Sequence, residues 1–352
     1  MTVKEGHNSF VTGTPDYHMR HPGLTRTTSQ VHLLIVAMSY KQTQYSLSVM
    51  EDARHIEQLA REYCGVRDIN TLFDNACSKD NVLQLLYDIG QRCGKDDYFV
   101  IYYAGHGAVL EEDNVFCCVT EFGQIDQSSM MTDDEFADAL LHDIPEETNI
   151  VLLLDTVHKQ PIVDLEKDPW SGRRAIDISG CRDFETAREH KISHFTQALL
   201  MAIENSCTDD HYSVGKLFNR MVAENDRLFR ISKQIDQDLT LACTGDIAPN
   251  EMAWPLVPRK PYEAPMKKAA KLKAAGFGAQ YVLEADFTTG HPSMQSKYGN
   301  PSPQNGGFKM RGIDIGDYKD VPDDLADWAK NNDIDLGDSY KDEELENGWK
   351  KG

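Results

Sequence analysis

Short apolar runs alternate with amphipathic segments over the first 250 residues of the chain. The runs with the length and composition of buried strands are HLLIVAM (32–38), DINTLF (68–73) and DYFVIYYAG (97–105). The segments 49–65 and 78–94 gather their apolar side chains on one helical face, and Gly65 is typical of a helix carboxyl end. Strands that are apolar throughout and separated by helices predict a mainly parallel sheet covered on both faces.

The same alternation continues toward the carboxyl end. VFCCV (115–119) and NIVLLLD (149–155) are predicted strands, and the helix between them, 131–144, begins with a capping box at Thr132 and Glu135. The stretch from 161 to about 190 is charged and without periodicity, so we predict irregular structure there. The further predicted elements are two helices and one strand: 193–205, 213–227 and 238–246.

Composition divides the chain into three parts. Residues 1–30 are polar and predict an extended arm, and residues 31–257 predict one α/β domain. Residues 258–352 are poor in apolar side chains; their last 40 residues carry 13 acidic and 5 basic side chains, too charged to fold alone. Two aromatic side chains of this extension, Trp328 and Trp349, predict docking onto a partner surface; the alternative is a solubilising tail in which the tryptophans have no such role.

Charge and apolar content exclude several classes of protein. The formal net charge of −21 disfavours nucleic acid and anionic membrane surfaces as partners, because both require clustered Lys and Arg. No segment has the ~18 consecutive apolar residues of a membrane span. The eight cysteines have no zinc-type spacing and predict reduced, buried thiols in an intracellular compartment, cytoplasmic or organellar after import.

Two predicted strands end in polar side chains. DYFVIYYAGHG (97–107) ends in a histidine between glycines, and NIVLLLDTVHKQ (149–160) ends in Asp155, Thr156, Val157 and His158. The carboxyl ends of neighbouring parallel strands meet at one edge of a sheet, which is where sites form in α/β folds. The sequence therefore predicts a site at this edge.

These two strands resemble the caspase-like peptidases, and the metacaspases most closely. That family carries Y-S-G-H-G on one strand and D-x-C-H-S-G on the next; His106 and Asp155 match the histidine and the leading aspartate. The resemblance covers residues 30 to 250. It implies a caspase-like α/β fold whose mainly parallel, six-stranded sheet is flanked by helices, with the arms at both ends extended.

The resemblance also implies a chemistry for each position. In a Cys/His dyad a thiolate attacks a peptide carbonyl and the histidine protonates the leaving amine. The backbone N–H of Gly107 would contribute to the oxyanion hole. Asp155 and the acid of the first helix, Asp52, would bind Arg or Lys of a substrate.

Several positions depart from the family pattern. The nucleophilic cysteine is replaced by Val157, and a second family cysteine is matched by Val49. Ala104 replaces the serine before the glycine–histidine pair. The Ser-Gly that follows the cysteine motif becomes Lys159 and Gln160, and Gln160 is predicted to narrow the cleft.

The family further implies a calcium site. Asp133, Asp134 and Asp164 match acids that bind the activating ion, and Asp113 or Asn114 falls near the remaining ligand position. The alternative is that Asp133 and Asp134 only favour the first turn of a helix. We predict that the site requires no cofactor. Calcium is the ion that the resemblance leaves as a candidate ligand of these acids.

We therefore expect a metacaspase-like pseudopeptidase, an inactive homologue of a cysteine endopeptidase. It would serve as a structural or regulatory protein-binding subunit, in a larger assembly, and contact partners through residues 1–30 and 258–352. The alternative is a calcium-dependent Arg/Lys-specific peptidase that uses Thr156 or a displaced cysteine as nucleophile.

Overall fold

A computed structural model describes residues 29–274 except 111–112, 159–160, 182–192, 205, 207–208, 210, 233–236 and 246. Most of the predicted amino-terminal arm lies outside these residues. So do Trp328 and Trp349, the predicted docking residues, and Lys159 and Gln160, the predicted cleft residues. The boundaries proposed for the three parts of the chain stay predictions.

The central sheet has six strands in the order β2-β1-β3-β6-β7-β8. All neighbours are parallel except β8, which runs antiparallel to β7. The six strands are β1 (Val31–Ala37), β2 (Asp68–Phe73), β3 (Tyr98–Leu110), β6 (Asn149–Val157), β7 (Arg174–Cys181) and β8 (Asp238–Cys243). The mainly parallel six-stranded sheet predicted from the sequence is confirmed.

Two short strands extend the sheet beside β3. β4 (Asp113–Cys117) pairs antiparallel with the end of β3, and β5 (Met130–Thr132) pairs antiparallel with β4. Strand β3 therefore does not end at residue 105, as the apolar run suggested. It continues through the glycine–histidine–glycine segment because β4 supplies a second hydrogen-bonding neighbour for that half of the strand.

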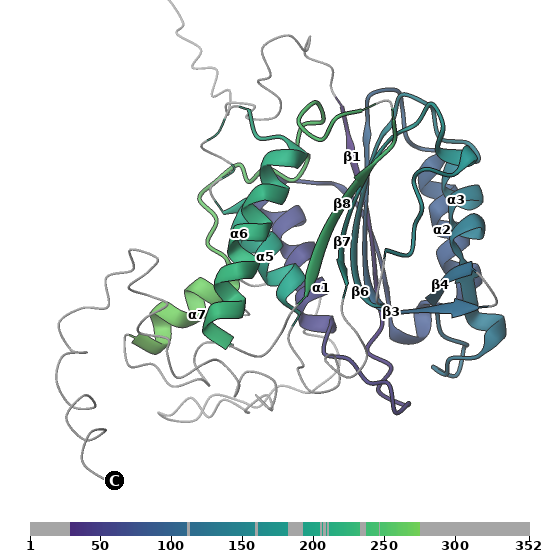
Figure 1. Cartoon of the computed structure of the whole chain (residues 1–352), viewed down its shortest axis with the longest axis horizontal. Helices are drawn as coiled ribbons and strands as arrows, with labels where there is room; N and C mark the ends of the chain where they lie inside the picture. Colours follow the sequence, from purple (N-terminus) through teal and green to yellow (C-terminus); the bar gives the residue numbers. More distant parts are fainter. Residues whose placement is uncertain are drawn as a thin grey trace, which may run out of the picture.

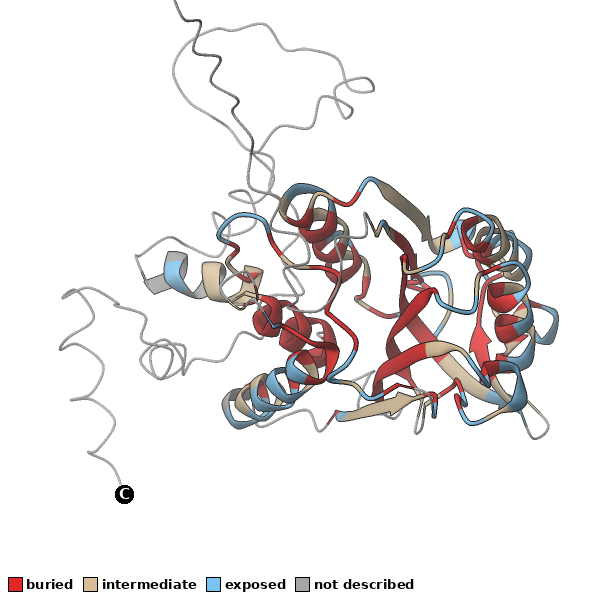
Figure 2. Cartoon of the chain, turned by 90° about the horizontal axis from the view of Figure 1, so that it is seen from above, coloured by how far each residue is buried: buried red, intermediate tan, exposed pale blue. Residues whose placement is uncertain are grey.

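Helices cover both faces of the sheet (Figure 1). On one face lie α1 (Met50–Gln58), with the π-helical turn Leu59–Cys64 that continues it, α5 (His194–Ile203) and α6 (Val214–Ser232). The other face is covered by α2 (Lys79–Gly90) and α3 (Asp133–Leu141). Viewed from above, the strands form the buried centre and the outer helix surfaces are exposed (Figure 2). No helix of the described residues combines the length and the apolar character that a membrane span requires.

Two helix ends that the sequence predicts, at Gly65 and Thr132, are confirmed. Gly65 ends the π-helical turn with φ of +69°, a left-handed conformation that costs glycine little. Thr132 caps α3: its hydroxyl accepts from the N–H of Glu135, and the Glu135 carboxylate accepts from the N–H of Thr132. This capping box fixes the start of α3, which carries two of the predicted calcium ligands.

The prediction of irregular structure between 161 and 190 is wrong over β7. This strand, RAIDISGC, is buried along almost its whole length between β6 and β8. Its polar residues interrupt the apolar run by which a central strand is recognised in a sequence. The buried Asp177 is tolerated because the hydroxyl of Ser179, two residues along the same face, donates to its carboxylate at 2.8 Å.

Burial raises the pKa of Asp177 to about 7, because the ionised carboxylate has lost its water. Ionisation of Asp177 therefore opposes folding at any pH above the pKa of an unfolded aspartate. This penalty grows as the pH rises toward about 7 and is constant above that value, where it amounts to at most about 4 kcal/mol.

Asp177→Asn is expected to stabilise the protein at pH 8 and to leave its stability nearly unchanged at pH 4, because the amide carries no charge to desolvate. Denaturant unfolding of both proteins between these pH values measures the difference. Asp238→Asn, at an exposed position of β8, is the control and should show no such trend. If the difference in stability between Asp177→Asn and the unmodified protein does not change with pH, the raised pKa of Asp177 is contradicted.

Candidate active-site remnant

The register of β3 and β6 places His106 directly beside Val157. Register partners in neighbouring parallel strands project to the same side of the sheet, so the two side chains share one face at the carboxyl edge. Ala104 and Asp155 form another pair of the same ladder. Val157 is buried and offers only methyl groups to the imidazole. Val49, the residue before α1, is buried as well.

His106 is enclosed by the loop that follows β1. Its Nε2 lies 2.6 Å from the carbonyl oxygen of Tyr45, and since a carbonyl can only accept, Nε2 carries the proton. The ring of Tyr40 lies 4.7 Å from the imidazole, centroid to centroid, and the Tyr40 hydroxyl accepts from the backbone N–H of His106. The imidazole is therefore held by hydrogen bonding and packing, with only 6% of the residue exposed.

Gly107, the predicted oxyanion-hole residue, is covered by the segment after β6. A Cβ atom added to Gly107 would lie 2.7 Å from Cδ1 of Ile162 and 2.9 Å from Cβ of His158. Only a glycine permits so close an approach. The space above Gly107 is filled by the chain itself.

The two predicted substrate-pocket acids both meet the first turn of α5. The Thr196 hydroxyl donates to Asp155 at 3.0 Å, and the Gln197 amide donates to Asp52 at 2.6 Å. The amide of Gln237 adds a bond to Asp155 at 3.3 Å. The amino end of the helix also favours negative charge. Asp52 and Asp155 thus both accept from the first turn of α5, each from a polar group of the same chain.

These partners were missed in the sequence, because a threonine and two glutamines far along the chain carry no motif. The Thr196 hydroxyl also lies 2.8 Å from the hydroxyl of Tyr102. Since the single Thr196 proton goes to Asp155, Tyr102 is the donor of that second bond. A chain of hydrogen bonds from Tyr102 through Thr196 to Asp155 links β3, α5 and β6.

Comparison with known proteins agrees with this geometry. Residues 30–240 match the family model described as the caspase domain. The chain belongs to the caspase domain family. Its sequence is similar to "Metacaspase-1" of Arabidopsis thaliana, with 25% identity over 181 residues, which cover 41% of this chain and 48% of that protein. The chain thus spans about half the length of this curated relative.

Two solved structures matched in the comparison come from a bacterium and an insect. Protein GSU0716 from Geobacter sulfurreducens has a TM-score of 0.45 and 17% identity, over 66% of this chain and all of the other. The Drosophila initiator caspase Dronc has a TM-score of 0.38 and 11% identity, over 61% of this chain and 80% of the other.

Burial affects the ionisation of the described thiols of this caspase domain. Burial raises the pKa of Cys93, Cys117, Cys118 and Cys181 to about 12, and it also raises the pKa values of Cys64, Cys77 and Cys243. A thiol attacks as the thiolate, so these pKa shifts lower its reactivity at neutral pH. Thr156 is fully buried beside Cys181 across the β6–β7 pair.

The predicted calcium ligands of the caspase domain lie near a lysine. Lys167 Nζ lies 2.9 Å from a carboxylate oxygen of Asp133 and 2.9 Å from one of Asp134. These two acids raise the pKa of Lys167. Asp164 accepts from the N–H of Glu166 at 3.0 Å. Within the described residues no cluster of three or more His, Cys, Asp and Glu side chains is arranged to hold a metal ion.

Asn114 also belongs to this region. It lies in β4 next to Val115, whose register partner in β5 is Thr132, the residue before Asp133. Lys167 was missed in the sequence because it lies 33 and 34 residues from the acids that it pairs with (167 − 134 and 167 − 133). The ammonium group lies where the two carboxylates would otherwise share a cation.

Lys167→Ala is expected to destabilise the protein by about 1–3 kcal/mol, because Asp133, only 4% exposed, loses its counter-charge. The variant should also gain a rise in melting temperature with millimolar CaCl2, whereas the unmodified protein should show little or none. Thermal unfolding with and without calcium measures both effects.

Lys95→Ala is the control, since Lys95 and its partner Glu147 are both mostly exposed and the pair is worth about 0.2–1 kcal/mol. A strong calcium response of the unmodified protein would show that Lys167 does not take the place of the ion.

Proposed function

We propose that this chain is a metacaspase-like pseudopeptidase that serves as a structural or regulatory protein-binding subunit of a larger assembly. The observation that carries the proposal is the register that sets Val157, rather than a thiol, beside His106. Valine has no ionisable or nucleophilic atom. A histidine without a neighbouring nucleophile cannot start acyl transfer.

Closure of the site supports the same proposal. A tetrahedral intermediate needs room for an oxyanion beside backbone donors, and His158 and Ile162 crowd Gly107 on the side where a Cβ would lie. A basic substrate side chain would need the two acids, which already accept bonds from Thr196 and Gln197. Such a side chain would therefore have to share the two acids with these internal donors.

A peptidase with a displaced nucleophile has less support. Its candidates need a reactive and accessible atom, whereas Thr156 is fully buried and burial raises the pKa of each described thiol. Cys207 lies outside the described residues.

The beginning of the carboxyl-terminal extension supports a binding role. The backbone N–H of Arg259 donates to the Tyr63 carbonyl at 2.8 Å, and Lys267 pairs with Glu204 at 2.7 Å. Tyr262 and Ala264 are buried against the domain. Residues 259–274 are thus attached to the α1–α5 face, and the partner contacts are proposed for the extension that follows them in the sequence.

Val157→Cys is expected not to create a peptidase, although it places a thiol beside His106, because His158 and Ile162 still cover Gly107. Hydrolysis of Arg and Lys peptide substrates, with and without calcium, measures the outcome. The matched double variant, Val157→Cys with Ile162→Gly, lacks one of the two covering side chains. It should react faster than Val157→Cys alone with an electrophilic probe that carries an arginine side chain.

The control for both variants is the additional substitution His106→Ala, which should lower any reaction that depends on the dyad. Peptide hydrolysis by the unmodified protein, abolished by His106→Ala, would overturn the proposal of an inactive domain.

Truncation tests the binding role. A chain ending at Ala274 should keep the stability of the full chain but separate from the proteins with which the full chain co-purifies in stoichiometric amounts. A chain ending at Pro258 should in addition lose about 2–4 kcal/mol of stability, because the buried Tyr262 is removed. Native size measurement and thermal unfolding give the two readouts. Recovery of the full chain from native extracts as a monomer alone would contradict a role in an assembly.

A further inference from the structure

The loop between β1 and α1, residues 38–49, is exposed in its middle and buried near both ends. Tyr40 is 3% exposed and Leu47 is 6% exposed. Five of the six residues between them are exposed: Lys41, Gln42, Gln44, Tyr45 and Ser46. The middle of the loop therefore buries little surface, which is the property of segments that open locally at a low free-energy cost.

The two ends of the loop are fixed to one another and to the domain. The backbone N–H of Leu47 donates to the Ser39 carbonyl at 2.7 Å. The backbone N–H and the hydroxyl of Ser39 donate to the Asp74 carboxylate at 2.8 and 2.6 Å. The Tyr40 hydroxyl donates to the Cys117 carbonyl at 2.7 Å. A loop whose ends are held this close can move its middle without displacing the strand and the helix on either side.

The middle of the loop is held together by its own hydrogen bonds. The backbone N–H and the hydroxyl of Thr43 both donate to the Tyr40 carbonyl, at 2.9 and 3.0 Å. The same hydroxyl accepts from the backbone N–H of Tyr45 at 3.0 Å. The side-chain amide of Gln44 donates to the Tyr45 hydroxyl at 2.9 Å. These bonds join residues of the loop to one another, so they can persist when the loop moves as a unit.

Tyr45 connects the middle of the loop to the remnant site. Its carbonyl oxygen accepts from Nε2 of His106 at 2.6 Å, and its ring lies 6.1 Å from the imidazole, centroid to centroid. This contact joins residues that are 61 positions apart in the sequence (106 − 45). Unlike the bonds inside the loop, it is lost when the loop moves away from β3.

The loop begins at a strained residue. The φ angle of Tyr40 is +50°, in the left-handed region that residues with large side chains rarely adopt. Such a conformation costs free energy and persists where the surrounding contacts impose it. Rotation of the Tyr40 backbone out of this region releases the strain. Tyr40 is therefore suited to act as a hinge between the fixed base of the loop and its exposed middle.

We propose that residues 41–46 form a lid that opens and closes over His106 by a local motion, hinged at Tyr40 and Leu47. The structure shows the closed form, in which 6% of His106 is exposed. Opening exchanges the bond between Nε2 and the Tyr45 carbonyl for bonds to water, and it gives solutes access to the imidazole. The lid controls this access whether or not the domain is a peptidase, so the proposal does not rest on the loss of the nucleophile.

Modification of histidines by diethyl pyrocarbonate, located by mass spectrometry on the full chain, tests the proposal. Two histidines of the same protein are references: His142 is exposed, and His32, away from the lid, is 4% exposed. His106 should react several-fold more slowly than His142 and several-fold faster than His32. Denaturant below the unfolding transition should accelerate His32 but change the rate of His106 little, because a local opening exposes little surface.

Thr43→Val removes the hydroxyl at the centre of the hydrogen bonds inside the loop, and it should make His106 react several-fold faster without changing the rate of His32. The double variant Thr43→Val with Tyr45→Gly also lacks the ring beside the imidazole and should react faster still. Thr148→Val is the matched control, since this hydroxyl donates to the Gly94 carbonyl at 3.0 Å just before the start of β6, at the other end of the sheet. It should leave the rate of His106 unchanged.

An unchanged reaction rate of His106 in both lid variants would overturn the proposal. So would a rate that rises with denaturant in step with the rate of His32, because His106 would then become accessible only when the domain unfolds.

Discussion

The parallel pairing of β3 with β6 is the constraint on which the rest of the molecule depends. It joins the two halves of the sheet, and its register decides which side chains meet at the carboxyl edge. With His106 beside Val157 the edge is packed like a core, because a valine contributes apolar contact where a thiol would contribute reactivity. Asp155 lies two residues before Val157 in β6, so its side chain projects to the same side of the sheet, where α5 contacts it.

Closure of this edge follows from the need of buried polar groups for partners. Each group that the caspase domain would use in catalysis is engaged by another segment of the chain. The loop after β1 provides a carbonyl for His106, the segment after β6 covers Gly107, and α5 provides donors to the two acids. Together these contacts stabilise the arrangement of the edge that the structure shows.

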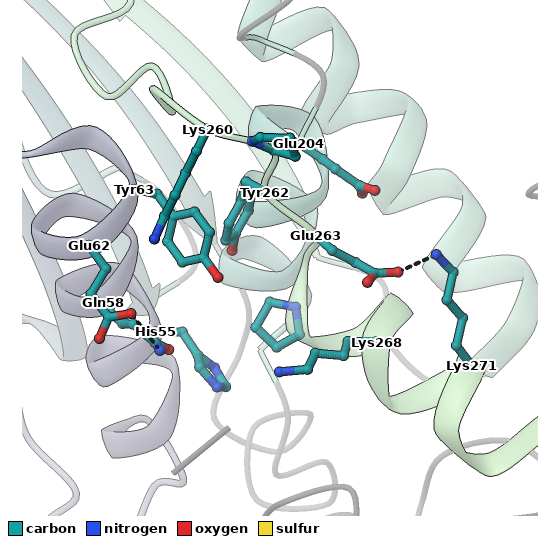
Figure 3. Close-up of a pocket in the computed structure, with 12 residues that line it drawn as sticks. His55, Gln58, Glu62, Tyr63, Glu204, Lys260, Tyr262, Glu263, Lys268 and Lys271 are labelled. Atoms are coloured by element: carbon teal, nitrogen blue, oxygen red, sulfur yellow. Dashed lines mark hydrogen bonds and ion pairs between the residues drawn. The ribbon is translucent and has the colours of Figure 1, made fainter. Parts of the chain in front are cut away.

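The described start of the carboxyl-terminal extension is held to the domain by other interactions. It is attached by the burial of Tyr262, by ion pairs such as Lys267–Glu204 and by the backbone bond from Arg259 to Tyr63. The α1–α5 face therefore has two separate roles. Near the strand ends it donates hydrogen bonds to Asp52 and Asp155, and elsewhere it holds the start of the extension, beside a ring-lined pocket (Figure 3).

The local patterns of the sequence determined the mainly parallel sheet apart from β7, the helices between its strands, the caps at Gly65 and Thr132, and a valine at the nucleophile position. These features depend on the spacing of neighbouring residues, which a sequence displays directly. Only the tertiary structure decided that β7 is a strand, that Lys167 pairs with Asp133 and Asp134, and that α5 donates to Asp52 and Asp155. In each case a buried polar group is stabilised by a partner that folding brings near. Neither a neutral amide nor a distant lysine can be recognised as such a partner in the sequence, because the contact forms only when the chain packs.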